Sequence, residues 1–150
     1  MVARRSVAEK LGLPILAKYI AYSVAGVPPE IMGKENIWYK INTNKKGVGP
    51  AYAIPEVLKK AGLTIEDIDI FEVNEAFASQ ASFCCAKLGL DLKKVNPKGG
   101  AIAFGHPLGA TGARQIATLL PELKRTGGRY GVTSMCIGTG MGAAAVFERE

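Results

Sequence analysis

Ile68-Asp-Ile-Phe-Glu-Val73 is a largely apolar run, and the chain continues from it into the segment Glu75 to Leu88. The run predicts a β-strand and the segment predicts an α-helix. No charged residue occurs in the middle of this helix, from Ala76 to Ala86, so we expect the helix to be buried on all sides. A strand that leads into a buried helix indicates a layered α/β arrangement.

Strands and helices alternate along the rest of the chain as well. The predicted elements are the end of a helix over Ala3 to Leu11, a buried strand over Ile15 to Val24, a helix over Pro50 to Ala61, a helix opened by the glycine-rich run Gly99 to Gly112, and closing strands over Tyr130 to Met135 and Ala143 to Phe147, joined by a turn over Gly138 to Gly142. The helix after the glycine-rich run has an apolar stripe formed by Ile116, Leu119, Leu120 and Leu123. It also contains Pro121, which costs about 3 kcal/mol unless the helix bends or stops. The alternation predicts one α/β domain over residues 1–150.

Composition narrows the class of protein. Hydrophobic residues make up 48% and charged residues 21% of the chain, as in globular domains. No apolar run reaches the roughly 18 residues that span a bilayer, and no apolar segment follows the basic start as in a secretory signal, so we expect an intracellular protein without a membrane span. The net charge is +6, and the segment Lys34 to Lys46 supplies half of it, so nucleic acid is not an expected partner.

The cysteine pattern argues against both a disulfide framework and a metal site. The chain has three cysteines, and two of them, Cys84 and Cys85, are neighbours that could bridge only with severe strain. With a single histidine and no CxxC pair, a zinc site would need ligands from scattered positions. We therefore expect no metal, and we interpret the thiols as core packing or as part of the chemistry.

The segment Lys34 to Lys46 fits neither a helix nor a strand. Lys, Asn, Ile and Tyr, whose codons are rich in A and T, fill ten of its thirteen places. Two interpretations remain open, a translated intron and a lysine-rich surface loop. In both, we expect a mobile surface insertion without chemistry, whose deletion by joining Gly33 to Val48 does not lower the stability.

Polar residues follow or interrupt the apolar elements at three places. Asn74 comes directly after the strand that ends at Val73, and its side chain can cap the following helix or belong to a site. Cys136 follows the strand Tyr130 to Met135 and can be a packing thiol or lie at a ligand site. His106 lies among backbone-shaping residues in Gly105-His-Pro-Leu-Gly109, which fits a functional histidine as well as a core one.

Together these residues suggest acyl transfer. A histidine can polarise a thioester carbonyl, a thiol can move a proton, and N–H groups of the glycines near Gly138 can stabilise an oxyanion. A clear nucleophile is absent. The alternative from the residues alone is a hydrolase-type pair of Cys136 with His106.

Three longer strings carry a resemblance to a known family. Asn74-Glu-Ala-Phe-Ala78, Gly99-Gly-Ala-Ile-Ala-Phe-Gly-His-Pro-Leu-Gly-Ala-Thr-Gly-Ala-Arg114 and Cys136-Ile-Gly-Thr-Gly-Met-Gly142 resemble the three C-terminal signature loops of the thiolases, in the same order. The similarity extends from Ala3 to Glu148 without the insertion, and within the family the sequence looks most like the peroxisomal 3-ketoacyl-CoA thiolases. The resemblance implies the C-terminal half of the αβαβα layered thiolase fold.

The resemblance also implies roles for individual residues. His106 would activate the nucleophilic cysteine of the Cys-x-Ser loop, and Cys136 would move a proton at the α-carbon of acetyl-CoA. Asn74 would hold a water that completes an oxyanion hole with His106, and Gly138 would lend its N–H to a second one. Phe77 and Pro107 would contact the substrate. Acyl-CoA and CoA are implied as substrates without a further cofactor, in a homodimeric peroxisomal enzyme of fatty-acid β-oxidation.

One part of the family pattern is missing from the sequence. Nothing in the chain matches the Cys-x-Ser loop, and Cys84 and Cys85 do not replace it because they lie in the predicted buried helix. We therefore interpret the chain as truncated at its N-terminus and expect it to be inactive alone. Two alternatives remain: a non-catalytic fragment that pairs with a full-length thiolase subunit, and a biosynthetic thiolase that forms acetoacetyl-CoA.

Overall fold

A four-stranded mixed sheet in the order β1-β4-β3-β2 forms the centre of the computed structural model, which describes residues 1–27 and 48–150. The strands are β1 (Ala17–Gly26), β2 (Ile70–Val73), β3 (Tyr130–Gly138) and β4 (Met141–Arg149). β2 runs parallel to β3, whereas β4 is antiparallel to both β3 and β1. The insertion predicted at Lys34 to Lys46 lies outside the described residues.

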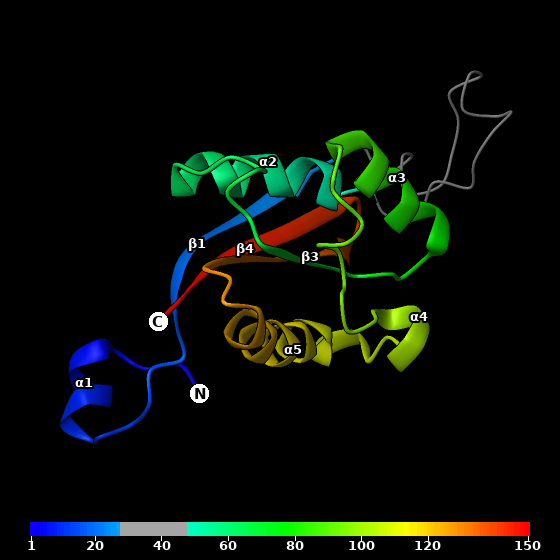
Figure 1. Cartoon of the computed structure of the whole chain (residues 1–150). Coiled ribbons are helices and arrows are strands. Elements are labelled where there is room, and N and C mark those ends of the chain that lie inside the picture. Colours follow the sequence, from blue (N-terminus) through cyan, green and yellow to red (C-terminus); the bar gives the residue numbers. More distant parts are fainter. Residues whose placement is uncertain (28–47) are drawn as a thin grey trace, which may run out of the picture.

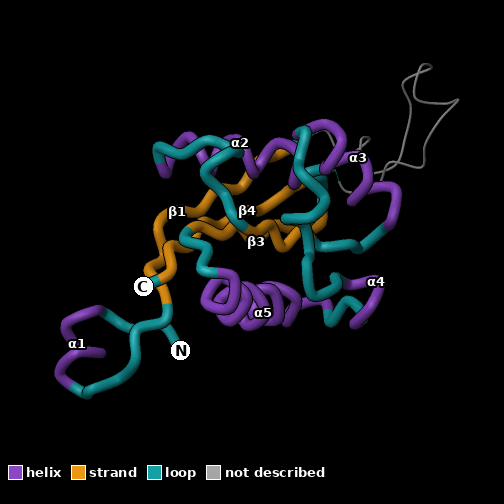
Figure 2. Tube along the Cα trace, viewed as in Figure 1, coloured by secondary structure: helices purple, strands orange, loops and turns teal. Residues whose placement is uncertain are grey.

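Helices cover both faces of the sheet, as Figure 1 and the tube in Figure 2 show. α2 (Pro50–Ala61) and α3 (Ala78–Leu88) lie on one face, and α4 (Ala101–Phe104) and α5 (Thr111–Thr126) lie on the other. The 3-10 helix η2 (Leu108–Ala110) precedes α5, and α1 (Arg5–Lys10) lies apart from the sheet near the N-terminus. The predicted layered α/β class is confirmed.

Two apolar clusters fill the two interfaces between sheet and helices. Alternate residues of a strand face opposite sides, so Phe71 of β2 packs toward α2 whereas Ile70 packs toward α5. On the α5 side, the helix contributes Leu119 and Leu123, with Ile116 and Leu120 packed against them, as predicted. α5 does not stop at Pro121 but continues to Thr126. The predicted bounds of α2 agree with the structure, and its C-terminal residue precedes Gly62 in a left-handed conformation.

Two burial predictions are wrong for the described chain. β1 is an edge strand, with Tyr19 and Tyr22 exposed, rather than a buried one. α3 is buried only at Gln80, Cys84 and Cys85, and its other face is open. An uncharged sequence shows that a helix can be buried, but neighbouring elements decide on how many sides it is covered.

Several boundaries differ from the prediction, and two of them concern predicted site residues. α3 begins at Ala78, and extended Phe77 takes the N-cap position, so Asn74 is not the cap of this helix. β3 runs on to Gly138, so Cys136 lies within the strand, paired with Gly142, and does not follow it. The hairpin to β4 is tight because Gly138, Thr139 and Gly140 adopt positive φ angles of 86°, 48° and 76°.

Gly142 lies where two backbones meet, and this predicts the effect of a methyl group there. A Cβ added to Gly142 would overlap the carbonyl carbon of Gly49, and backbone at both positions leaves little room to relax. We expect Gly142→Ala to lower the free energy of unfolding by about 1–3 kcal/mol or more, measured by urea titration. The matched control is Gly26→Ala, because a Cβ there meets no atom within 4 Å. Equal urea midpoints for Gly142→Ala and Gly26→Ala would show that the backbone around Gly142 moves enough to accept a methyl group.

Candidate active site

The predicted site residues lie at the carboxyl end of the two parallel strands. Asn74 directly follows β2, is fully buried, and donates its backbone N–H to the carbonyl oxygen of Ser134 at 2.8 Å. Val73 pairs with Ser134 in the parallel register, so Asn74 lies beside the residues of β3 that lead to Cys136. Carboxyl ends of parallel strands are the edge at which α/β sheets present ligand sites.

His106 reaches this edge from the loop between α4 and η2. Its Nε2 lies 3.5 Å from Nδ2 of Asn74, and its Nδ1 lies 2.6 Å from Oγ1 of Thr111, the first residue of α5. The loop turns through Gly105 and Leu108, which have φ angles of 88° and 47°. Both ring nitrogens therefore have a partner, and the orientation of the ring is fixed.

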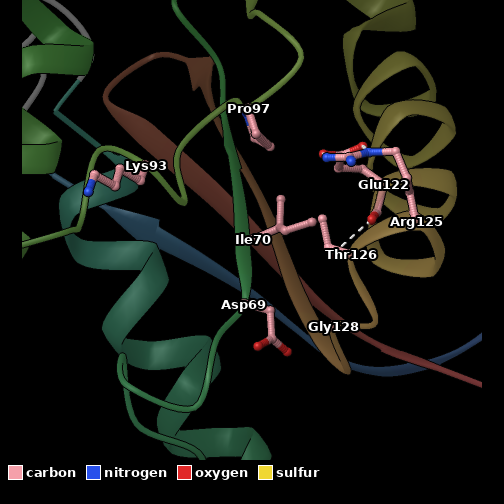
Figure 3. Close-up of a pocket in the computed structure, with 8 residues that line it drawn as sticks. All are labelled: Asp69, Ile70, Lys93, Pro97, Glu122, Arg125, Thr126 and Gly128. Atoms are coloured by element: carbon pink, nitrogen blue, oxygen red, sulfur yellow. Dashed lines mark hydrogen bonds and ion pairs between the residues drawn. The ribbon is translucent and has the colours of Figure 1, made fainter.

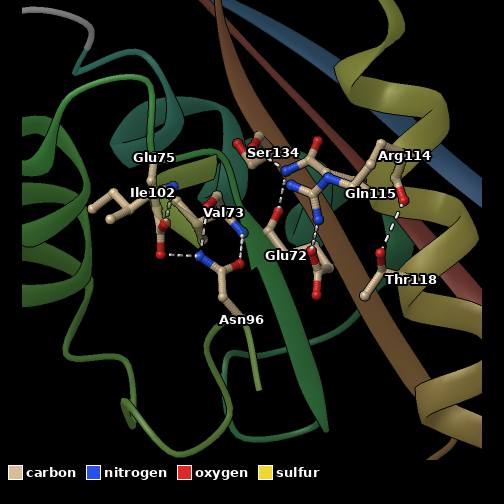
Figure 4. Close-up of polar contacts among 9 residues, drawn as sticks. All are labelled: Glu72, Val73, Glu75, Asn96, Ile102, Arg114, Gln115, Thr118 and Ser134. Atoms are coloured by element: carbon tan, nitrogen blue, oxygen red, sulfur yellow. Dashed lines mark hydrogen bonds and ion pairs between the residues drawn. The ribbon is translucent and has the colours of Figure 1, made fainter. Parts of the chain in front are cut away.

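Glu75 fixes the segment that carries His106, and the sequence analysis did not identify it. Its Oε1 accepts a hydrogen bond from Nδ2 of Asn96 at 2.8 Å, and its Oε2 accepts one from the backbone N–H of Ile102 at 2.9 Å (Figure 4). A Cβ on Gly100 would overlap the Glu75 carboxylate, so this close approach requires glycine. Glu75 lies in the signature string Asn74 to Ala78 and Gly100 lies in the next one, but neither string shows that the two residues meet.

Cys136 has a different partner from His106. Its thiol donates to Oε1 of Gln80 on α3 at 3.7 Å, and Gln80 is fully buried. Burial raises the pKa of Cys136, as it raises the pKa of Cys85 and, to about 12, that of Cys84. A nucleophilic cysteine needs a lowered pKa, so none of the three thiols is prepared as a thiolate.

The structure thus joins two of the three predicted catalytic residues directly. Asn74 contacts His106, whereas Cys136 is at the same edge of the sheet but binds Gln80. Phe77, exposed by 47%, lies at the start of α3, and Pro107 lies exposed directly before η2. Gly138 ends β3 in the hairpin. Convergence of His106 and Cys136 on one substrate and the substrate contacts of the other residues stay predictions.

A polar network joins β2 to α5 next to the carboxyl edge of the parallel strands (Figure 4). Nη1 of Arg114 donates to Oε2 of Glu72 at 2.7 Å, and the Glu72 side chain is fully buried. Nε2 of Gln115 donates to the carbonyl oxygens of Glu72 and Ser134 at 2.8 and 3.0 Å. The network therefore ties α5 to both parallel strands.

The buried carboxyl group makes the stability depend on pH. Burial raises the pKa of Glu72 to about 7 from 4.5, against the opposing hydrogen bond and charge of Arg114. Because the folded pKa is the higher one, the stabilising contribution is fully present below about pH 4.5 and is lost as the pH rises through 7. We expect the free energy of unfolding to fall across this window by at most about 3 kcal/mol.

Urea unfolding between pH 5 and pH 8 tests this expectation. Glu72→Gln should remove the fall, because the amide does not titrate in this range. The carboxyl groups of Asp67, Glu122, Glu148 and Glu150 have lowered pKa values, so their effect has the opposite sign and lies at lower pH. The same slope in the unaltered chain and in Glu72→Gln would contradict the assignment.

A shallow pocket of about 260 Å³ lies near the other end of α5 and is separate from these residues (Figure 3). It is lined by Asp69, Ile70, Lys93, Pro97, Glu122, Arg125, Thr126 and Gly128. Two of its charged groups pair with each other: Glu122 lies 2.6 Å from Arg125, and it also lies 3.6 Å from Lys98. None of the predicted site residues lines it.

The described residues contain neither a membrane-spanning helix nor a cluster of metal ligands. In residues 1–27 and 48–150, no helix has the length and apolar character needed to cross a membrane. The same residues contain no group of three or more His, Cys, Asp or Glu side chains arranged to hold a metal ion.

The described residues form an α/β layered domain in which Asn74 and His106 meet at the carboxyl edge of the parallel strands and Cys136 lies in β3 near the same edge. Residues 13–149 match the family described as Thiolase, C-terminal domain. The chain therefore belongs to the thiolase family, and the predicted resemblance is confirmed.

Individual relatives agree with this assignment. Rat 3-ketoacyl-CoA thiolase B, a peroxisomal protein, is 66% identical over 149 residues, which cover 99% of this chain and 32% of the rat protein. The crystal structure of the dimeric peroxisomal thiolase of Saccharomyces cerevisiae superposes with a TM-score of 0.83 at 61% identity, covering 99% of this chain and 34% of that one. Human mitochondrial 3-ketoacyl-CoA thiolase in complex with CoA gives a TM-score of 0.86 at 43% identity, covering 99% and 34%.

The chain spans about a third of the length of these relatives. The predicted similarity to peroxisomal 3-ketoacyl-CoA thiolases is confirmed, and the match spans 99% of the chain, whereas the prediction ran from Ala3 to Glu148 without Lys34 to Lys46.

Proposed function

We propose that this chain carries the acid/base and oxyanion-hole residues of a 3-ketoacyl-CoA thiolase, which cleaves a 3-ketoacyl-CoA with the thiol of a second CoA. The observation that carries the proposal is the contact of Asn74 with His106 at the strand edge, 3.5 Å between Nδ2 and Nε2. The names of the relatives supply the substrate class. The nucleophilic cysteine would come from the part of a thiolase that this chain does not match.

His106 acts first as a base and then as a donor. With Nδ1–H donating to the Thr111 hydroxyl at 2.6 Å, Nε2 is free to take the proton of the nucleophilic thiol. The resulting Nε2–H lies beside the amide group of Asn74, so the two donors can stabilise the same enolate oxygen, directly or through a water held by Asn74. Gly138 lends its N–H to a second oxyanion hole.

Cys136 supplies and removes the proton at carbon. Burial raises its pKa, so the thiol holds its proton at neutral pH. When the carbon–carbon bond breaks, the S–H proton passes to the α-carbon of the departing acetyl-CoA enolate and leaves a thiolate. That thiolate takes the proton of the incoming CoA thiol, whose sulfur attacks the acyl group on the nucleophilic cysteine. The bond to the nucleophilic cysteine then breaks, and the departing thiolate recovers its proton from Nε2 of His106. Cys136 returns to its protonated state.

The proposal extends to the substrates, the assembly and the compartment. CoA and acyl-CoA are proposed as substrates, contacted by Phe77 and Pro107, without a further cofactor or metal. The assembled enzyme is proposed to be a homodimer that acts in fatty-acid β-oxidation in the peroxisome; the yeast relative is described as dimeric, and the similar rat and yeast thiolases are peroxisomal by name. The alternative is a biosynthetic thiolase that joins two acetyl-CoA molecules, and the ratio of cleavage to condensation rates separates the two.

A hydrolase-type Cys136–His106 pair has less support. Such a pair needs a thiolate hydrogen-bonded to the imidazole, whereas burial raises the pKa of Cys136 and its sulfur donates to Gln80. Acylation of Cys136 by a thioester in the isolated chain would favour it.

The test is thiolysis of a 3-ketoacyl-CoA by the purified chain, alone and after coexpression with the N-terminal two thirds of the rat relative. We expect no turnover by the chain alone, because acyl transfer cannot begin without an acyl acceptor. Coexpression should restore turnover. Turnover by the chain alone that Cys136→Ala abolishes would contradict the proposal. Binding to a full-length thiolase subunit without restored turnover would favour a non-catalytic partner.

A further inference from the structure

The first turn of α5 is tied to both parallel strands at the point where they reach the site. Gln115 is fully buried, and its Nε2 donates to the carbonyl oxygens of Glu72 at 2.8 Å and Ser134 at 3.0 Å (Figure 4). The neighbouring Arg114 adds the ion pair with the Glu72 carboxylate at 2.7 Å. One turn of a helix is thus fastened to the main chain of β2 and β3 and to a side chain of β2.

The same turn holds one side of the His106 ring. Thr111 and Gln115 are four residues apart and so lie on one face of the helix. Thr111 is fully buried, and its Oγ1 lies 2.6 Å from Nδ1 of His106. A shift of α5 along or away from the sheet would therefore move the partner of Nδ1.

The strands hold the other side of the ring. Asn74, whose Nδ2 lies 3.5 Å from Nε2 of His106, donates its backbone N–H to Ser134 at 2.8 Å. This is the same carbonyl oxygen that accepts from Gln115. The two partners of the imidazole, Asn74 and Thr111, are therefore connected through one shared oxygen and one buried side chain.

We propose that Gln115, together with the Glu72–Arg114 pair, positions the His106 imidazole against Asn74. These are positioning residues, because the hydrogen bonds of His106 in the described residues go to Asn74 and Thr111, and each of the three acts through one of these two. A displacement of about 1 Å in a catalytic group can cost about 100-fold in rate, so fixed spacing between α5 and the strands matters more than the strength of any one bond. The inference rests on the proposed function only for the chemical role of His106.

The chain contains a single histidine, which gives the test a direct readout. In the ¹⁵N-labelled 150-residue chain, the imidazole nitrogen signals in an NMR spectrum come from His106 alone. Gln115→Met removes both hydrogen bonds to the strands and keeps a similar volume. We expect this variant to lose the contact between Nδ1 of His106 and Thr111. Both imidazole nitrogen signals should then shift toward the values of an exposed histidine side chain without hydrogen-bond partners. The matched control is Thr118→Ala, because the Thr118 hydroxyl donates only to the carbonyl oxygen of Arg114 within α5, at 3.1 Å.

The ion pair gives a second series, recorded at pH 5, where Glu72 is neutral and Arg114→Met is expected to cost less stability than at pH 8. Arg114→Met should shift the His106 signals in the same direction as Gln115→Met, and Arg114→Lys, which keeps the charge, should shift them less. This series decides the question if Gln115→Met fails to fold.

A purely structural role gives a different result. Gln115→Met or Arg114→Met would then lower Tm while the imidazole signals and their pH titration stay as in the unaltered chain, and this outcome would overturn the proposal. The NMR signals of His106 do not depend on turnover. They can therefore be measured even if the proposed thiolase function is wrong. In the coexpressed enzyme, the same variants should lower kcat with little change in KM, since they do not contact the substrate.

Discussion

Cys136→Ala is expected to lower the turnover of the coexpressed enzyme by about 10²–10⁴-fold, because proton transfer to the enolate carbon would lose its positioned donor. His106→Gln should lower turnover at least as much, since it removes both the base for the nucleophile and a donor of the oxyanion hole. Asn74→Ala should cost about 10²–10³-fold, the usual effect of deleting one oxyanion-hole donor. The measurement is the rate of 3-ketoacyl-CoA thiolysis with each purified variant.

The control for these variants is Cys85→Ala. Cys85 is a buried thiol of α3 outside the proposed machinery, so the loss of a sulfur atom there should leave kcat unchanged. The acid/base and nucleophile roles of Cys136 can be separated with a labelled substrate. In the proposed mechanism, Cys136→Ala still forms the acyl-enzyme on the other cysteine. Failure to form any acyl-enzyme would mean that Cys136 accepts the acyl group.

Arg114→Met is expected to give the second large effect, a loss of about 3–5 kcal/mol in the free energy of unfolding at pH 8. The Glu72 side chain is fully buried, so without its cationic partner the carboxyl group at pH 8 must either stay charged without a counter-charge or take up a proton, and both lower the stability. At pH 5 the loss should be smaller, because Glu72, whose pKa burial raises to about 7, is then neutral and needs no counter-charge. Urea unfolding of Arg114→Met and of the unaltered chain at pH 5 and at pH 8 measures the loss in free energy of unfolding at each pH.

The double variant distinguishes a charge effect from lost packing. Glu72→Met with Arg114→Met replaces both charges by apolar side chains, and it should recover most of the stability that Arg114→Met loses. Arg5→Met is the exposed control: Arg5 pairs with Glu150 at the surface, so its loss should leave the unfolding midpoint nearly unchanged. A double variant as unstable as Arg114→Met, with equal losses at pH 5 and pH 8, would mean that the Arg114 stem contributes through packing alone.

The sequence by itself determined the family and several elements. Three signature strings in order identified the thiolase family, and the family match over residues 13–149 agrees. The bounds of α2 followed from its apolar face, from Pro50 at its start and from Gly62 at its end. The apolar stripe of α5 likewise predicted which side packs on the sheet. These features were predictable because periodicity and end signals are local properties of the chain.

Only the tertiary structure decided the partners of the polar residues. Glu72 is one acidic residue inside an apolar strand, and its partner Arg114 is 42 positions away, so no spacing rule links them. The same holds for Glu75, which fixes Ile102, and for Gln80, which binds Cys136. The strand that encloses Cys136 extends to Gly138 because β4 pairs with it there. Hydrogen bonds between elements depend on how those elements pack, and a single sequence records the packing faces but not which polar groups meet across them.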